Sequence, residues 1–289
     1  MTGTGTETDP FVISAKDTPQ QIWADFIQAI GTSSAFVQCP KDYHLDMDKV
    51  APEGWNTQTR WRAKQVYGNG FTICNLHSSC SEAYGLFRLD GSTHYVHELN
   101  FDSFYYAGSV SFFGGSTANN YSYFKRCGFS GIMANNIFFS AANKVDFTVK
   151  SGENSKGCYF NIKFLNNSQF HAGNYSMTHF CSNIVLSGSS TNSQTKTNLT
   201  FKSCLFSGNL PFPQLVIKGQ YNVFDMDIAT GQEIACGSNN GADMQQCLIN
   251  SDKVAEGAIL HELLIPVTTS QMSDAAYLAE KGFPIGVDD

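Results

Sequence analysis

One eight-residue phrase occurs twice in this chain and constrains the fold more than any other feature. The copies start at Phe124 (FKRCGFSG) and at Phe201 (FKSCLFSG), and six of their eight positions are identical. Their separation equals three turns of about 25 residues, a short fixed period that is typical of stacked repeat architectures. We therefore expect a solenoid whose coils place equivalent residues in shared interior columns. The expected ladder residues are Phe124, Cys127, Phe129, Phe201, Cys204 and Phe206.

The composition agrees with an extended β protein. Charged residues make up only 15% of the 289 residues, against roughly 25% in an average soluble protein. The net charge of −7 argues against a nucleic-acid partner, because phosphate contacts need clustered Lys and Arg. No apolar run is long enough to cross a bilayer, so we expect no membrane insertion.

Local patterns predict the structure of the chain before the repeat region. Residues 1–17 have neither the basic nor the apolar segment of a signal peptide, and they predict a flexible N-terminal arm. Thr18-Pro19-Gln20-Gln21 is a capping box, and an apolar stripe at helical spacing follows it. Residues 18–35 therefore predict a helix that caps the open end of the solenoid.

The rest of the chain divides into two regions. Residues 36–235 consist of short β runs separated by Gly, Asn and Ser, a pattern that suits a sandwich, a barrel or a β-helix. The repeated phrase favours the β-helix among these three. Residues 236–289 contain a second capping box that begins at Thr268, and they predict a small C-terminal capping or oligomerisation module.

A capping helix, the segment Phe36-Val-Gln-Cys39, the phrase Val66-Tyr-Gly-Asn-Gly-Phe-Thr-Ile73 and coils bearing Phe and Cys occur together within about residues 18–235. In this combination the chain resembles the pectate-lyase-like class of proteins. The resemblance implies an all-β fold, a single-stranded right-handed parallel β-helix. Within that class, the small size and the N-terminal arm look most like bacteriophage virion proteins such as tailspikes, appendages and capsid spikes. The ending, residues 269–285, is similar to the tails of phage structural proteins.

Enzymes of the class that the chain resembles hold calcium with clustered acids, and glycosidases use paired carboxylates. Asp225 and Asp227 stand two apart, so in a strand both would face one side. Asp90, Glu98 and Asp102 would gather if their coils stack. These are the candidate catalytic residues if the protein is an enzyme. Most of the acids stand singly beside Gly, Ser and Asn, as solvated corner residues do, so the sequence favours no catalytic residue and no cofactor.

The sequence also argues against a metal site. His94 and His97 would lie on opposite faces of a strand, which is poor metal geometry. The nine cysteines are spread along a chain without a recognisable leader peptide. We expect most or all of them to be reduced, buried thiols in a protein made in the cytoplasm of a bacterial host.

Tyrosines in polar segments are the candidate binding residues, because tyrosine supplies both apolar area and a hydroxyl group. They are Tyr105, Tyr106, Tyr121, Tyr123 and Tyr175. The sequence thus predicts a virion structural protein, a spike, fibre or appendage that displays a rigid β-helix for attachment to a host-surface glycan or protein. Its expected partners are itself as a homotrimer and other virion proteins through the N-terminal arm. The alternative is a polysaccharide-degrading lyase or glycoside hydrolase, a depolymerase, on the same fold.

Overall fold

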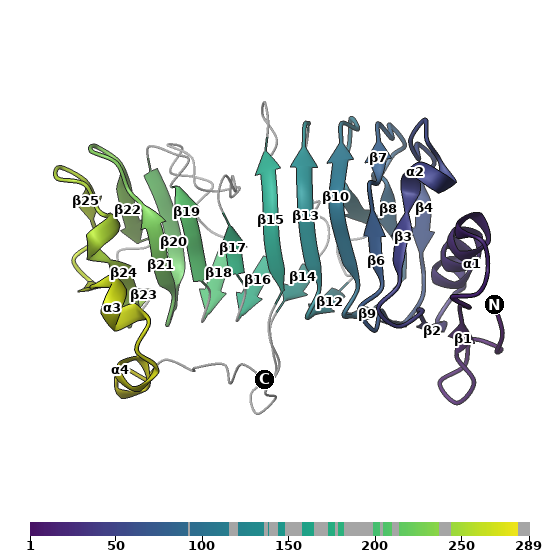
Figure 1. The fold of residues 1–289 in the computed structure, drawn as a ribbon, viewed down its shortest axis with the longest axis horizontal. Coiled ribbons are helices and arrows are strands. Elements are labelled where there is room, and N and C mark those ends of the chain that lie inside the picture. The colour runs from purple at the N-terminus through teal and green to yellow at the C-terminus, as the bar shows by residue number, and fades with distance from the viewer. Residues whose placement is uncertain are drawn as a thin grey trace. The chain divides into compact units, whose positions relative to one another are not determined.

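The computed structural model describes residues 1–91, 93–115, 121–135, 138, 144–147, 158–164, 173–176, 179–181, 199–202, 205–209, 214–236 and 244–282. The chain forms two compact units. Unit 1 comprises Met1–Asp146 and Ile162–Ala172, and unit 2 comprises Phe147–Asn161 and Gly173–Asp289. Each unit is a stack of parallel strands (Figure 1). The prediction of an all-β parallel β-helix is therefore confirmed.

Unit 1 contains three parallel sheets, which we name A1, B1 and C1. Sheet A1 runs in the order β1 (Phe11–Val12), β2 (Phe36–Gln38), β5 (Gln65–Tyr67), β9 (Thr93–His97), β12 (Tyr121–Lys125) and β14 (Lys144–Phe147). Sheet B1 consists of β3 (His44–Asp46), β6 (Thr72–Cys74), β10 (Asn100–Tyr106) and β13 (Gly128–Met133), with β7 (His77–Ser78) beside β10. Sheet C1 consists of β4 (Thr59–Trp61), β8 (Phe87–Leu89) and β11 (Phe113–Gly115). The helices are α1 (Pro19–Gly31) and α2 (Met47–Val50).

Unit 2 contains two parallel sheets, A2 and B2. Sheet A2 runs in the order β16 (Gly173–Ser176), β18 (Leu199–Lys202), β20 (Gln214–Gln220), β22 (Glu233–Cys236) and β25 (Ile259–Leu260), with β23 (Met244–Gln245) beside β20. Sheet B2 runs in the order β15 (Tyr159–Phe164, of which residues 159–161 belong to unit 2), β17 (His179–Cys181), β19 (Leu205–Asn209), β21 (Val223–Asp227), β24 (Cys247–Asn250) and β26 (Leu264–Val267). The described residues of unit 2 also form three short helices: η2 (Ser251–Lys253), α3 (Thr269–Met272) and α4 (Ala275–Glu280).

The interior of unit 1 is built around a column of apolar side chains from sheet B1. Leu45, Ile73, Phe101 and Phe129 are Cα partners in neighbouring strands, and all four are almost fully buried. The rings of Phe101 and Phe129 stack with their centroids 5.9 Å apart and their planes 7° apart. Because side chains alternate across a strand, one inward position per strand is enough to continue this column from coil to coil.

Unit 2 repeats the same construction in sheet B2. Phe160, Phe180, Phe206 and Phe224 are successive Cα partners, and the rings of Phe206 and Phe224 stack 5.0 Å apart at 13°. Phe129 and Phe206 hold the same place in the two copies of the repeated phrase. Each is a buried member of its unit's interior column.

The other expected ladder residues are placed as follows. Phe124 in β12 and Cys127 after it are buried, and the Cys127 thiol lies 3.7 Å from the carbonyl oxygen of Val96. Phe201 lies in β18, in register with Tyr175. Cys204 lies outside the described residues. The alignment of the two copies in common columns would run from one unit to the other, and it stays a prediction.

Helix α1 covers the first coil of unit 1. It begins after Thr18, whose hydroxyl accepts a hydrogen bond from the Gln21 amide at 3.2 Å, and Pro19 takes the first helical position, where its missing N–H costs nothing. One face of the helix is buried. Phe26 on that face contacts Phe71, with ring centroids 5.8 Å apart.

Residues 1–17, predicted to be a flexible arm, are instead folded against unit 1. Strand β1 pairs with β2, and Thr2 forms an antiparallel bridge with Val12. The α-ammonium group of Met1 lies 2.6 Å from the carboxylate of Asp25. Backbone pairing and this ion pair hold the segment in place, and neither can be read from its polar composition.

The described cysteines agree with what the sequence indicates. The six cysteines whose side chains the structure describes are free: Cys39, Cys74, Cys80, Cys127, Cys158 and Cys247. None of the helices in the described ranges is long and apolar enough to span a bilayer.

Candidate binding face and corner hollow

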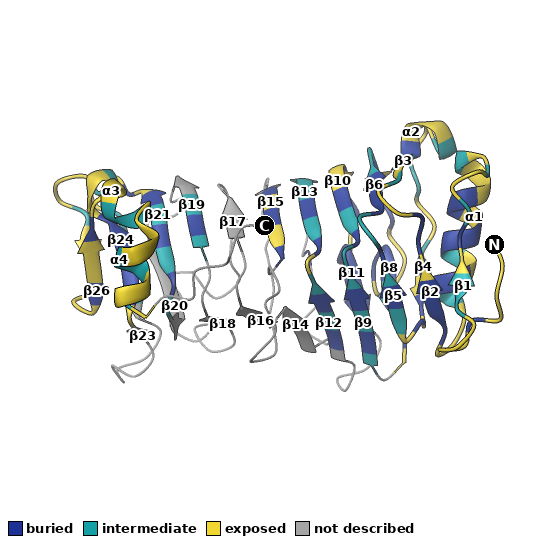
Figure 2. Ribbon diagram, turned by 60° about the horizontal axis from the view of Figure 1, so that its bottom comes forward, coloured by how far each residue is buried: buried dark blue, intermediate teal, exposed yellow. Residues whose placement is uncertain are grey.

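The outer face of sheet A1 carries two stacks of aromatic rings. Strands β5, β9 and β12 turn Val66, Val96 and Phe124 inward, so the residues on either side of each point outward. Figure 2 shows the resulting alternation of buried and intermediate positions along β9 and β12. Outward residues in neighbouring parallel strands then lie directly beside one another.

Register decides which of these rings meet. Tyr95 pairs with Tyr123 across β9 and β12, and their rings stack 5.0 Å apart at 10°. Tyr67 pairs with His97 across β5 and β9, and these rings stack 5.5 Å apart at 17°. We name these four residues the tyrosine face. Each ring covers one face of its partner, and all four residues stay partly exposed.

A polar hollow adjoins the tyrosine face at the corner where each A1 strand leads into a B1 strand. The corner residues Asp42, Asn69, Glu98 and Arg126 all have left-handed backbone conformations, with φ between 50° and 54°. Glu98 follows His97 directly, and Arg126 follows Lys125. The hollow has a volume of about 350 Å³. It is lined by Lys41, Asp42, Asn69, Gly70, Glu98, Asn100 and Arg126.

The charged groups of the corner hollow are arranged in pairs. The Arg126 guanidinium forms an ion pair with Glu98, and the ammonium group of Lys41 lies 3.9 Å from the carboxylate of Asp42. The Asn100 side-chain oxygen accepts a hydrogen bond from the Gly128 amide at 2.8 Å. The Asn69 side-chain amide donates to the carbonyl of Cys39 at 3.2 Å. Both asparagines are therefore fixed by backbone partners before any ligand arrives.

The acids Asp90, Glu98 and Asp102 each contact a different set of residues. Asp90 is buried, and its carboxylate lies 2.7 Å from Nε of Arg88 and 3.7 Å from Nε of Arg60. Glu98 belongs to the corner hollow. Asp102 is exposed on the outer face of B1, in register with Cys74. Each carboxylate is thus committed to its own surroundings, and only Glu98 lies in the hollow.

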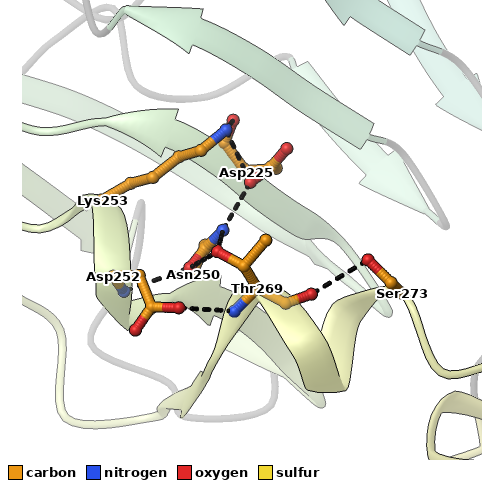
Figure 3. A network of polar contacts seen from close by, with 6 residues as sticks. All are labelled: Asp225, Asn250, Asp252, Lys253, Thr269 and Ser273. Atoms are coloured by element: carbon orange, nitrogen blue, oxygen red, sulfur yellow. Dashed lines mark hydrogen bonds and ion pairs between the residues drawn. The ribbon is translucent and has the colours of Figure 1, made fainter.

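Asp225 and Asp227 do share one face of β21, as the spacing predicts, but Asp225 takes part in a polar network that ties sheet B2 to the C-terminal helices (Figure 3). The Asp225 carboxylate lies 2.9 Å from the Lys253 ammonium group and accepts a hydrogen bond of 2.7 Å from the Asn250 amide. Asp227 is exposed, in register with Asn209. Of these two acids, Asp225 therefore takes part in a structural contact, and Asp227 is a surface residue.

Asn250 is the centre of that network. It is fully buried, and its amide nitrogen also donates to the Thr269 hydroxyl at 3.0 Å. Its oxygen accepts from the Asp252 amide at 3.1 Å. Asp252 in turn accepts from the Thr269 amide at 2.8 Å. The chain thus enters α3 with its first residues fixed to sheet B2.

An apolar cluster continues this contact. Leu248 and Val267 are buried beneath partly buried apolar side chains from sheet B2 and from both C-terminal helices. Leu248 is in register with Val223 on the outer face of the sheet. The neighbouring inward column carries Phe224 and Ile249. Helices α3 and α4 therefore cover part of the outer face of B2.

The five tyrosines proposed for binding have different surroundings. Tyr123 belongs to the tyrosine face, and Tyr105 is 40% exposed on sheet B1 beside His77, with ring centroids 6.1 Å apart. Tyr106 is fully buried, and its hydroxyl donates to the carbonyl of Ser111 at 2.9 Å. It is therefore a core residue and not a binding residue. Tyr121 and Tyr175 lie in β12 and β16, but their side chains lie outside what the structure describes.

Sequence reasoning missed Tyr67, Tyr95 and His97. The available signal was the period-two alternation of Gln65-Val66-Tyr67 and of Thr93 to His97, which places one aromatic residue per strand on the outer face. A search for tyrosines in polar segments does not select these residues, because the buried residues Val66 and Val96 adjoin them. Their stacking follows from register across coils, which no single segment contains.

His94 lies in the same strand as His97 but faces the interior of unit 1. Its Nδ1 lies 2.8 Å from the carbonyl oxygen of Ala63 and therefore carries the proton. Its Nε2 is buried and has no hydrogen-bond partner. Burial lowers the pKa of His94 below its ordinary value. This histidine is neutral and structural.

Among the described residues, the remaining titratable groups do not form a metal centre. Across the described ranges, no three His, Cys, Asp or Glu side chains come together as a metal ion would require. Cys74 lies beside Asp102 and Asp46, and burial, followed by these two carboxylates, raises the pKa of its thiol. It is therefore not activated as a nucleophile.

Comparison of the chain with protein-family models, with curated proteins and with solved structures finds no match in any of the three.

Proposed function

We propose that this protein is a bacteriophage virion structural protein, a spike, fibre or appendage that displays a rigid β-helix for attachment to the host surface. The observation that carries the proposal is the tyrosine face beside the corner hollow. Stacked rings in register lose little conformational freedom when a partner binds, and tyrosine is enriched at recognition surfaces. The fold supports rigid display because each coil is held by its neighbours.

The proposal includes partners that the sequence suggested. A homotrimer would repeat the tyrosine face three times, and multivalent contact raises avidity without any new kind of contact. Other virion proteins would meet the protein through residues 1–17 in their folded form. The protein would be made in the bacterial cytoplasm and then incorporated into the particle.

Cell binding tests this proposal. Fluorescently labelled full-length protein is added to a panel of bacterial strains, and bound protein is measured by flow cytometry. On a strain that binds the wild type, the double variant Tyr95→Ala/Tyr123→Ala should have an affinity lower by roughly tenfold or more, a loss of about 1.4 kcal/mol or more. Tyr159→Ala is the matched control, because Tyr159 is an exposed tyrosine of unit 2. Equal binding by the double variant and the wild type would refute an attachment role for this face.

A depolymerase is the second candidate, and one observation favours it. The corner hollow contains two carboxylates, Asp42 and Glu98, and glycosidases need such a pair. Against it, Glu98 is ion-paired with Arg126, and the Asp42 side chain is 73% exposed. Neither carboxyl group has the apolar surroundings that keep a general acid protonated.

Product analysis separates the two candidates. Surface polysaccharide from a strain that binds the protein is incubated with it and assayed for new reducing ends or unsaturated products. We expect none. Turnover that disappears in Glu98→Gln or Asp42→Asn would establish the enzyme, and turnover lost in Asp225→Asn would locate it in unit 2.

A further inference from the structure

We infer that the corner hollow and the adjoining tyrosine face bind a linear, uncharged glycan that lies across successive coils of unit 1. This inference rests on the proposed function and adds to it the chemical class, direction and length of the ligand. Four observations carry it: the row of corner residues, the balance of charge, the hydrogen-bonding groups and the orientation of the rings.

The first observation is geometric. Asp42, Asn69, Glu98 and Arg126 occupy the same corner in four successive coils, because each follows the next A1 strand in register order. Neighbouring strands lie about 4.8 Å apart, so the row extends over about 14 Å, a length that about three hexose rings laid end to end would fill. The row crosses the strands, so an extended ligand that touches every corner must also cross them.

The second observation is charge. The lining of the hollow holds two cations, Lys41 and Arg126, and two anions, Asp42 and Glu98, so its formal charge is zero. The whole chain carries −7, and a field of that sign disfavours the approach of a polyanion. An uncharged polymer is not repelled by this field, and it needs no net charge in the hollow.

The third observation is hydrogen bonding. A sugar hydroxyl group both donates and accepts, so it is served best where donors and acceptors alternate closely. The Glu98 carboxylate accepts and the Arg126 guanidinium donates, and their ion pair places the two side by side. Asn69 and Asn100 are held by backbone partners, so their ordering costs little when a ligand binds.

The fourth observation is how the rings are turned. Tyr67 stacks on His97 and Tyr95 stacks on Tyr123, so one face of each ring is covered by its partner and less ring surface is left for a flat aromatic ligand. The three tyrosines also carry hydroxyl groups, which both donate and accept hydrogen bonds. This surface matches a hydroxyl-rich ligand better than an aromatic or aliphatic one.

The test uses the full-length protein and defined oligosaccharides of increasing length. Immobilised malto- and cello-oligosaccharides serve as uncharged probes, and oligogalacturonides of matched length serve as acidic probes. Binding is measured by surface plasmon resonance. We expect affinity for at least one uncharged series to rise up to about three residues and then level off, because the row of described corner residues is about that long. The affinity for the acidic series should be lower by roughly tenfold or more.

Variants locate the site. Glu98→Gln and Arg126→Gln should each lower the affinity for the uncharged series roughly tenfold, whereas Asp102→Asn, which changes an exposed carboxylate outside the hollow, should not. Thermal unfolding by circular dichroism checks that each variant is folded. Equal or tighter binding of the acidic series, unchanged binding by the two hollow variants, or no binding of either uncharged series would each overturn the inference.

The two proposals fail separately. One outcome is that cells bind the wild type, binding is lost in Tyr95→Ala/Tyr123→Ala, and the uncharged oligosaccharides do not bind. The attachment role is then supported and the proposed ligand class is wrong. If the uncharged oligosaccharides bind but no strain does, the ligand class stands and the attachment role is refuted.

Discussion

The outer faces of sheet B1 in unit 1 and sheet B2 in unit 2 have different surroundings. In unit 1 it carries polar groups such as His44, Asp46 and Asp102, all at least partly exposed. In unit 2 it carries Leu248 and Val267, which are buried beneath the chain's own C-terminal helices. The inward column is apolar in both. Coil stacking thus fixes the inward positions alone, and the outward positions are left to serve as surface, as a docking site for the chain itself or as a binding face.

The largest expected effect tests whether the helices truly cover the face of unit 2. Leu248→Ala removes an outward-facing side chain that is fully buried only because α3 and α4 lie over it. It should lower the free energy of unfolding by about 2–5 kcal/mol, measured by urea denaturation. The matched change in unit 1, Asp102→Ala, should cost within about 0.5 kcal/mol because its side chain is exposed. Equal costs would break the comparison.

The polar half of the same contact should matter next. Asn250→Ala removes a fully buried side chain that hydrogen-bonds the Asp225 carboxylate and the Thr269 hydroxyl, and a hydrogen bond to a charged group contributes about 1.5–3 kcal/mol. Asp227→Asn changes an exposed carboxylate in the neighbouring strand and is the control. Urea denaturation again gives the cost, and limited proteolysis should show α3 and α4 cleaved faster in Asn250→Ala. A cost no larger than that of the control would mean that the network does not hold the helices.

A smaller effect is expected on the open face of unit 1. A double-mutant cycle of Tyr95→Ala and Tyr123→Ala should give a coupling energy of about 0.5–1.5 kcal/mol, the usual value for a stacked aromatic pair. The same cycle with Tyr67 and Tyr123, which are not register partners, should give a value near zero. A coupling that is equal in the two cycles would show that the stacks do not persist in solution.

The smallest effect concerns pH and sharpens the contrast between the two faces of β9. The folded pKa of His94 is lowered by burial from the ordinary value of 6.5. Below about pH 6.5 the unfolded chain therefore binds a proton that the folded chain does not, so stability is complete above that pH and falls as the pH drops towards the folded pKa. Thermal midpoints should decline less between pH 7 and pH 5 in His94→Gln than in the wild type. An equal decline of the thermal midpoint with pH in both proteins would contradict a buried, neutral His94.

Much of the fold could be predicted from the sequence because its signals are local. The capping box at Thr18 and the apolar stripe after it indicated helix α1, and the repeated phrase indicated interior columns that contain Phe129 and Phe206. The arm was the exception. Residues 1–17 are mostly polar, and their order comes from the pairing of β1 with β2 and from the ion pair between Met1 and Asp25, contacts that join segments far apart in the sequence.

The candidate site was less predictable for the same reason. The sequence selected Tyr123 and Glu98, but it gave no reason to join Tyr123 to Tyr95 or Glu98 to Arg126. Each pairing depends on the number of residues in the intervening coil. A slip of one residue would turn an outward side chain inward, so the pairs exist only once every coil length is fixed.

By itself, the sequence determined the class of architecture, the first helix and the apolar character of the interior, because periodicity, capping and composition are properties of short segments. Only the tertiary structure decided which outward residues meet, that Asp225 is held by Lys253 and Asn250, and that α3 and α4 lie on sheet B2. The physical reason is that stacking brings together residues one coil apart. The contacts of the surface therefore depend on the register of the whole stack, whereas the interior needs only an apolar side chain at each inward position.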